Sequence, residues 1–287
     1  MPILSLAYLT SAPLSPPDAI ALAAELGYQA VGLRALPVAP GAAFSPLIED
    51  AGLLRETIAR MKATGVAVFD VEIVRLGATF DPETVRPFFE TCQRLDAKAV
   101  LVAGDDPDEA RLTASFAAFC EAAAPYGLTG DLEFMPWTKV PDARTAQRIA
   151  VKAAQPNARV LVDSLHAGRS STTLADLAAL PRSLLGYAQI CDAPGEVPVT
   201  AEGLIHTARQ ARLLPGDGGL DLVGIFAQLP QDLPVSVEIP NDRGMAELGV
   251  REWARQALAA SKAVLAKRDE AVAKGKSLRQ DVDGGAG

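Results

Sequence analysis

Eight short apolar segments, each followed by a segment with helical periodicity, constrain the fold of this 287-residue chain more than any other feature. Segments such as AVLVAG (99–104) are uninterrupted apolar runs, which is typical of strands buried on both faces. The predicted strands lie at residues 3–9, 30–34, 66–74, 99–104, 128–135, 158–163, 184–191 and 234–239. Repeated strand–helix units imply parallel strands with right-handed crossovers. Eight such units close into a barrel, so we predict an α/β fold, a single-domain (β/α)8 TIM barrel.

Helix-terminating residues support this division of the chain. The segment after the first strand begins with Ser15 as N-cap, carries prolines in its first turn and ends at Gly27. The rival fold, an open doubly wound sheet, needs a glycine-rich fingerprint after the first strand, and YLTSAPLSPP contains none. We assign residues 1–265 to the barrel. Residues 266–287 are expected to form a surface helix that frays into a flexible tail.

Charge and cysteine content exclude several classes of partner. The formal net charge is −8, and the sequence contains no cluster of lysine and arginine of the kind that binds nucleic acid or an anionic membrane. The three cysteines are scattered, which favours a reducing compartment over a disulfide framework. Neither a signal peptide nor a membrane-spanning run is recognised. We therefore expect a cytoplasmic protein that acts on a small molecule. A homo-oligomer is left open.

Four successive predicted strands end in a side chain with an oxygen donor, and in a parallel barrel these ends surround the active site. The four residues are Glu133, Asp163, Gln189 and Glu238. Carboxylates that converge in a barrel mouth repel one another unless a cation joins them. Oxygen donors favour Mn²⁺ or Mg²⁺, with Co²⁺ or Zn²⁺ as further options. The alternative is that each acid caps a helix or forms a salt bridge.

Further site candidates flank these strand ends. His166, three residues after Asp163, is a candidate acid/base catalyst, although capping a helix or supporting a metal ligand is the alternative. His206 is expected to be structural. Candidate substrate-binding residues, each of which also has a plain packing or ion-pair explanation, are Arg212, Glu72, Arg75, Trp137 and Asp192.

The motifs LEFMPW, LVDSLH, AQICDAP, RLLPGDGGLDL and VSVEIPND, in this order, resemble the xylose isomerase-like TIM barrel superfamily. This superfamily holds sugar (phosphate) isomerases and epimerases, inosose dehydratase and isomerase relatives, and endonuclease IV. The resemblance implies a divalent metal held by Glu133, Asp163, Gln189 and Glu238. Family epimerases often have histidine at the position of Gln189. Glutamine there, with the Asp163–His166 spacing, looks closer to the bacterial 3-dehydroshikimate dehydratases. Two histidines in the chain are too few for the multi-zinc site of endonuclease IV relatives.

These observations lead to one main functional hypothesis and two alternatives. The main hypothesis is a metal-dependent sugar (phosphate) isomerase/epimerase that acts on a small hydroxy-carbonyl substrate through a metal-stabilised enediolate. Glu133 and Glu238 would take and return the proton. If His166 instead removes the proton and a β-hydroxyl leaves, the site becomes a 3-dehydroshikimate dehydratase-like or inosose dehydratase-like lyase. The second alternative is a barrel that binds a metabolite without turning it over.

Overall fold

The computed structural model describes residues 1–39 and 41–284, except for the side chains of residues 275–284. Eight parallel strands form a closed barrel in sequence order, and β1 pairs with β8. The strands are β1 (Leu4–Leu6), β2 (Ala30–Arg34), β3 (Ala67–Leu76), β4 (Ala99–Gly104), β5 (Thr129–Glu133), β6 (Ala158–Asp163), β7 (Leu185–Ile190) and β8 (Val235–Val237). The predicted (β/α)8 barrel is therefore confirmed.

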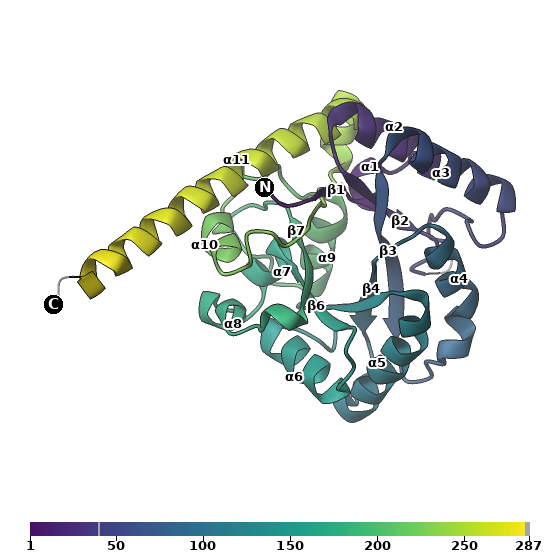
Figure 1. The fold of residues 1–287 in the computed structure, drawn as a ribbon, viewed down its shortest axis with the longest axis horizontal. Coiled ribbons are helices and arrows are strands. Elements are labelled where there is room, and N and C mark those ends of the chain that lie inside the picture. Colours follow the sequence, from purple (N-terminus) through teal and green to yellow (C-terminus); the bar gives the residue numbers. More distant parts are fainter. Residues whose placement is uncertain (40, 285–287) are drawn as a thin grey trace.

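Helices surround this barrel (Figure 1). The α-helices are α1 (Tyr8–Ser11), α2 (Pro16–Leu26), α3 (Ala51–Thr64), α4 (Arg86–Arg94), α5 (Glu109–Ala123), α6 (Ala143–Ala153), α7 (Ser164–Arg169), α8 (Leu174–Ala178), α9 (Ala201–Gln210), α10 (Leu222–Ala227) and α11 (Asp242–Gly284). Short 3-10 helices are η1 (Pro82–Val85), η2 (Ala124–Tyr126) and η3 (Arg182–Leu184). Ser15 caps α2 by accepting a hydrogen bond from the Asp18 amide, and Gly27 ends α2 with a φ of 89°, as the sequence predicted.

The first strand is shorter than the apolar run that predicted it. Only Leu4–Leu6 is extended, and Tyr8 begins α1 at the mouth of the barrel. The Thr10 hydroxyl donates to the Val237 carbonyl at 2.8 Å and accepts from the Ile239 amide at 2.7 Å. These bonds tie α1 to the chain that leaves β8. An apolar run of this length fits a strand or a helical turn equally well, so the sequence could not locate the change.

Alternation along each strand places two layers of side chains inside the barrel. In β3 and β5, Glu72 and Glu133 belong to the layer at the mouth, and Asp70 and Asp131 lie one step below them. Glycines make room for the lower carboxylates. A Cβ on Gly186 would lie 1.6 Å from Asp131 Oδ1, so no other residue fits there.

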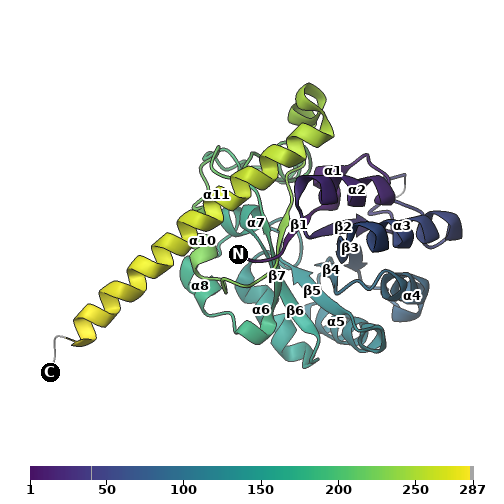
Figure 2. The same cartoon turned by 45° about the horizontal axis from the view of Figure 1, so that its top comes forward.

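The last helix begins at Asp242 and contains a break at Gly249, where φ is 76°. The proposed domain boundary after residue 265 falls inside α11, and Arg268 beyond it is still buried. Figures 1 and 2 show the C-terminal part of α11 extending away from the barrel. The end of the predicted flexible tail, 285–287, lies outside the described residues.

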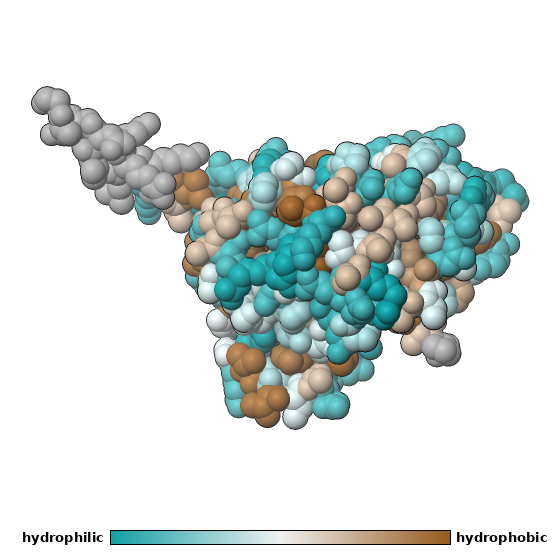
Figure 3. Space-filling view, turned by 90° about the horizontal axis from the view of Figure 1, so that it is seen from below, coloured by the Kyte–Doolittle hydropathy of each residue, from teal (hydrophilic) through white to brown (hydrophobic). Residues whose placement is uncertain are grey.

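The surface in Figure 3 is mainly hydrophilic, with apolar residues in small groups. Within the described residues, no helix is both long and apolar enough to span a membrane.

Candidate metal and substrate site

The four strand-end residues predicted as metal ligands come together at the mouth of the barrel. Glu133 ends β5, Asp163 ends β6, Gln189 lies in β7, and Glu238 follows β8. All four side chains are buried. Asp163 and Gln189 are paired in register, and Gln189 Nε2 donates to Glu238 Oε1 at 3.1 Å. The barrel closure therefore gathers groups that are 105 residues apart in the chain, from 133 to 238.

Arg212 links two of these residues. Its Nη1 lies 2.6 Å from Asp163 Oδ2, and its Nη2 lies 2.9 Å from Glu238 Oε2. Its Nε donates to the Ala208 carbonyl. The guanidinium is 3% exposed, so water does not screen these pairs. The sequence predicted that Arg212 binds substrate. In the structure Arg212 lines the pocket and also pairs with these two carboxylates.

His166 joins Glu133 and Asp163 in a compact group. Its Nε2 lies 3.6 Å from Glu133 Oε1 and 3.7 Å from Asp163 Oδ2. One potential ligand atom from each of these three residues lies within 4.8 Å of the others. The Trp137 ring packs edge-on against the imidazole, with ring centroids 5.0 Å apart. His166 is thus a nitrogen donor beside the oxygen donors, which the four-residue prediction did not include.

Burial dominates the protonation of the group. Burial lowers the pKa of His166 to about 4, so the imidazole is neutral at pH 7. Burial raises the pKa of Glu238 to about 8 despite the nearby Arg212. Burial, then Asp163 and Glu238, raise the pKa of Glu133 well above its usual range. Asp163 has a lowered pKa, because Arg212 and His166 outweigh the effect of its burial.

The donor atoms fit a divalent cation. Gln189 Oε1 is buried without a hydrogen-bond partner, and a buried carbonyl oxygen in that state needs a donor or a cation. Glu133 has no cationic partner among the described residues, unlike Asp163 and Glu238, which share Arg212. Glu133, Asp163, Gln189 and Glu238 could hold the ion, with His166 as a further donor. Oxygen donors with one imidazole suit Mn²⁺, Mg²⁺, Co²⁺ or Zn²⁺.

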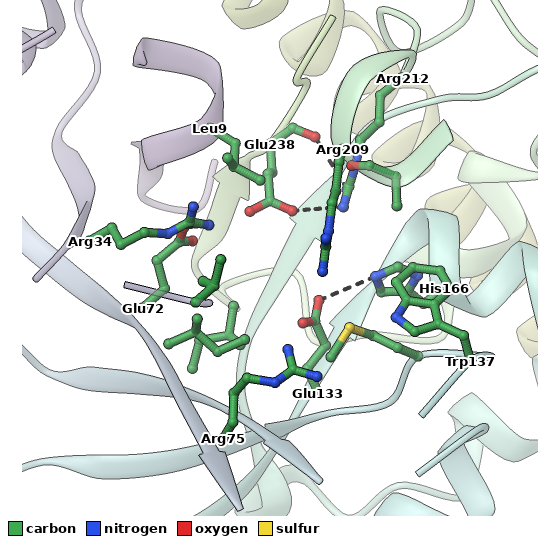
Figure 4. A pocket seen from close by; sticks show the side chains of 15 residues that line it. Leu9, Arg34, Glu72, Arg75, Glu133, Trp137, His166, Arg209, Arg212 and Glu238 are labelled. Carbon is green, nitrogen blue, oxygen red and sulfur yellow. Dashed lines mark hydrogen bonds and ion pairs between the residues drawn. The ribbon is translucent and has the colours of Figure 1, made fainter. Parts of the chain in front are cut away.

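A pocket opens above this group, and Figure 4 shows the side chains that line it. The pocket has a volume of about 150 Å³, which suits a small molecule. Three of the predicted substrate-binding residues besides Arg212 line it, namely Glu72, Arg75 and Trp137. The apolar part of the wall is formed by Leu9, Val38, Ile73, Leu101 and Met135.

Two lining residues were missed by the sequence analysis, Arg34 and Arg209. Arg34 ends β2, and its Nη2 lies 2.6 Å from Glu72 Oε1. It could have been found by applying the strand-end criterion to the second strand as well as to the last four. Arg209 lies in the last turn of α9, and no pattern in the sequence distinguishes it from a solvated helix residue.

Asp192 is not among the residues that line this pocket, and its contact with substrate stays a prediction. Its carboxylate accepts hydrogen bonds from four backbone amides, those of Ala193, Gly216, Gly218 and Leu220. Its backbone also pairs with Leu213, next to Arg212. Asp192 therefore fixes the PGDGG segment and the chain that carries Arg212. His206 is exposed and bonds to Gln210 within α9, in line with the structural role expected for it.

Comparison with known proteins now identifies the fold family. A family described as the xylose isomerase-like TIM barrel matches residues 20–264. The chain belongs to this family. The resemblance drawn from the strand-end motifs is therefore confirmed at the level of the family.

Individual proteins that resemble this chain share only a small part of its sequence. A 3-dehydroshikimate dehydratase of Pseudomonas aeruginosa is 30% identical over 163 residues, which are 54% of this chain and 25% of that protein. The chain thus spans a quarter of the curated relative that it matches.

Two solved structures share the fold at low identity. The IOLI protein with a binding zinc atom has a TM-score of 0.76 at 18% identity, over 92% of this chain and 98% of that one. A D-allulose 3-epimerase from Methylomonas sp. has a TM-score of 0.67 at 16% identity, over 91% and 96%. The family thus includes a sugar epimerase and a dehydratase, and the buried group of Glu133, Asp163 and His166 is consistent with a metal site.

Proposed function

We propose that this chain is a divalent-metal-dependent isomerase or epimerase that acts on a small hydroxy-carbonyl compound. The observation that carries the proposal is that Glu133 and Glu238 line one pocket from separate strands, beside the unpartnered oxygen of Gln189. A bound divalent ion would act as a Lewis acid toward the substrate oxygens. Its ligands would be Glu133, Asp163, Gln189 and Glu238, with Mn²⁺ or Mg²⁺ as the preferred ions.

The chain's own groups supply proton transfer. Isomerisation requires one group that removes a proton next to the carbonyl and one that returns a proton. Glu238 follows β8, lines the pocket and is the candidate group that returns the proton. Glu133 faces the same pocket, and burial raises its pKa, so its ionised carboxylate is a strong base and the candidate for removing the proton. Trp137 and the apolar wall residues exclude water from the reacting carbon.

A lyase that removes water is the second candidate, and two observations favour it. The curated relative with 30% identity is named a 3-dehydroshikimate dehydratase. His166 is neutral at pH 7 and lies 3.6 Å from Glu133, so the imidazole can accept a proton. In this reaction His166 would remove the proton, and a β-hydroxyl of the substrate would leave as water. Dehydroshikimate-like compounds and inososes then join sugars as substrate candidates.

The test is an NMR assay in D₂O of Mn²⁺-loaded protein with keto-sugars, inososes and dehydroshikimate. Deuterium at the carbon next to the carbonyl, with no loss of water, is the result expected for an isomerase or epimerase. Formation of a new conjugated double bond would assign the lyase. Glu238→Gln should abolish either reaction with the fold intact, while Glu247→Gln, the same change at an exposed helix position, should not. Binding of a substrate without any exchange would contradict both reactions and favour a non-catalytic barrel.

A further inference from the structure

Four arginines line the pocket, and they come from different elements. Arg34 ends β2, Arg75 lies in β3, Arg209 lies in α9, and Arg212 follows it. Figure 4 shows the side chains of Arg75 and Arg209 reaching into the pocket from opposite sides, with Glu133 seen between their ends and His166 to the right in this view. Three of these four arginines form ion pairs with carboxylates.

Arg209 is the arginine without an acidic partner. Arg34 pairs with Glu72, Arg75 with Asp105, and Arg212 with Asp163 and Glu238. Among the described residues, no carboxylate forms an ion pair with Arg209. Partial burial lowers the pKa of Arg209, and the charges of Arg75 and Arg34 lower it further. Arg209 is exposed at the mouth of the pocket, and an anion placed there would offset the repulsion between Arg209 and its like-charged neighbours Arg75 and Arg34.

Arg75 is held in position for such an anion. Its Nε and Nη2 donate to the two oxygens of Asp105, at 2.7 and 2.8 Å. A guanidinium has five N–H donors in a rigid plane, so the pair with Asp105 leaves further donors on the pocket side. Arg209 has all its donors available for a ligand. Arginine donors of this kind bind carboxylates and phosphates in a two-pronged geometry.

We propose that Arg75 and Arg209 form a subsite for a carboxylate group of the substrate. The choice of a carboxylate rests on the proposed function, because it uses the charge of the metal ion. The four arginines face five carboxylates, those of Glu72, Asp105, Glu133, Asp163 and Glu238. A divalent cation held by Glu133, Asp163 and Glu238 would keep these three carboxyls ionised, and it would turn this excess of one negative charge into an excess of one positive charge. A single carboxylate on the substrate neutralises that charge, whereas a phosphate dianion exceeds it.

The subsite also narrows the substrate class. A neutral keto-sugar would leave Arg209 uncompensated, and a hydroxy-carbonyl acid would pair with it. The carboxylate would lie toward the mouth, between Arg75 and Arg209, and the reacting hydroxy-carbonyl part would lie toward Glu133 and His166. The two ends of the substrate would thus be recognised by different groups, which fixes its orientation at the reacting carbon.

The experiment compares binding of benzoate, benzamide and inorganic phosphate to the full chain by calorimetry. Benzoate and benzamide have nearly the same shape and differ in charge, and neither carries the hydroxyl beside a carbonyl that a hydroxy-carbonyl substrate would offer to the metal. Arg75→Met and Arg209→Met remove each charge while keeping most of the side-chain length. Arg255→Met is the control, because Arg255 is exposed on α11 and pairs only with Glu252. Each titration is done with Mn²⁺ and again with EDTA.

We expect benzoate to bind the Mn²⁺-loaded protein at least about 10-fold more tightly than benzamide or phosphate. Arg75→Met and Arg209→Met should each weaken benzoate binding about 10-fold or more, and Arg255→Met should not change it. Equal binding of benzoate and benzamide, wild-type affinity in Arg209→Met, or no saturable benzoate binding would overturn the subsite. Tighter binding of phosphate would overturn the choice of a carboxylate.

The same titrations separate the subsite from the proposed function. If benzoate binding depends on Arg209 in EDTA but the protein takes up no Mn²⁺, the subsite stands and the metal-dependent reaction fails. If Mn²⁺ binds and benzoate does not, the subsite is refuted and the proposal of a metal-dependent reaction stands.

Discussion

Arg212→Met tests how the charges at the barrel mouth are balanced. Arg212 is buried and contacts both Asp163, at 2.6 Å, and Glu238, at 2.9 Å. Removing one partner of a buried ion pair typically costs about 3–5 kcal/mol, because the remaining charge is left without compensation. Here two carboxylates would lose their partner at once. We therefore expect the free energy of unfolding in EDTA to fall by about 3–5 kcal/mol.

A divalent ion among the same carboxylates should replace part of the missing positive charge. At a Mn²⁺ concentration 100 times the dissociation constant, binding to the folded state alone adds about 2.7 kcal/mol of stability. In the wild type, the guanidinium of Arg212 competes with Mn²⁺ for Asp163 and Glu238. The Arg212→Met variant lacks this competitor, so its dissociation constant for Mn²⁺ should be lower than that of the wild type. At a fixed Mn²⁺ concentration, the variant should therefore gain more stability than the wild type.

The assay is urea unfolding of both proteins in EDTA and in Mn²⁺, followed by circular dichroism. Arg268→Met is the matched control, since Arg268 is also buried and pairs with Asp269 on α11, away from the site. This control should lose stability and gain no more from Mn²⁺ than the wild type does. The reasoning is refuted if Arg212→Met unfolds at the wild-type midpoint in EDTA, or if Mn²⁺ stabilises Arg268→Met as much as Arg212→Met.

Three further predictions follow from buried groups elsewhere. Gly218→Ala should unfold at a lower urea concentration than Gly77→Ala. A Cβ on Gly218 would lie 2.3 Å from Asp192 Oδ1, whereas a Cβ on Gly77 has no atom within 4 Å. Equal unfolding midpoints for the two variants would exclude this close approach. Burial raises the pKa of all three cysteine thiols, so Ellman's reagent at pH 8 should not label any of them rapidly in the folded protein. Rapid labelling before urea is added would contradict this prediction. Burial, and then nearby carboxylates, raise the pKa of Asp70, so the folded state loses stability as pH rises above the ordinary carboxyl pKa. Asp70→Asn should therefore raise the melting temperature more at pH 8 than at pH 5, and an effect independent of pH would show that Asp70 is not protonated in the fold.

The sequence predicted the barrel, and it predicted that four strand-end side chains meet at the mouth, because both depend on local patterns. An apolar run such as ARVLVD specifies a buried strand, and the acid that ends it then lies at the mouth of any parallel barrel. Arg34 follows the same rule at the end of β2 and could have been included.

Long-range contacts could not be predicted in this way. Arg212 lies in an irregular segment, and only the folded chain brings it to Asp163, which is 49 residues earlier. Asp192 resembled a site carboxylate because it follows a strand, yet the glycine-rich segment turns four amides toward it. Arg209 gains its position from the docking of α9 over the pocket, which no spacing of residues in the sequence encodes. These side chains depend on loop conformation, and local periodicity does not determine that conformation.

The central claim is that the strand-end residues bind one divalent ion, and a direct Mn²⁺ titration tests it. Calorimetry on metal-free protein would compare the wild type with Glu133→Ala and Gln189→Leu, and mass spectrometry would measure the metal content of each purified protein. We predict one equivalent of Mn²⁺ in the wild type and binding at least about 10-fold weaker in both variants, a loss of about 1.4 kcal/mol or more. Binding of Mn²⁺ that is unchanged in Glu133→Ala, or no binding in the wild type, would contradict the account.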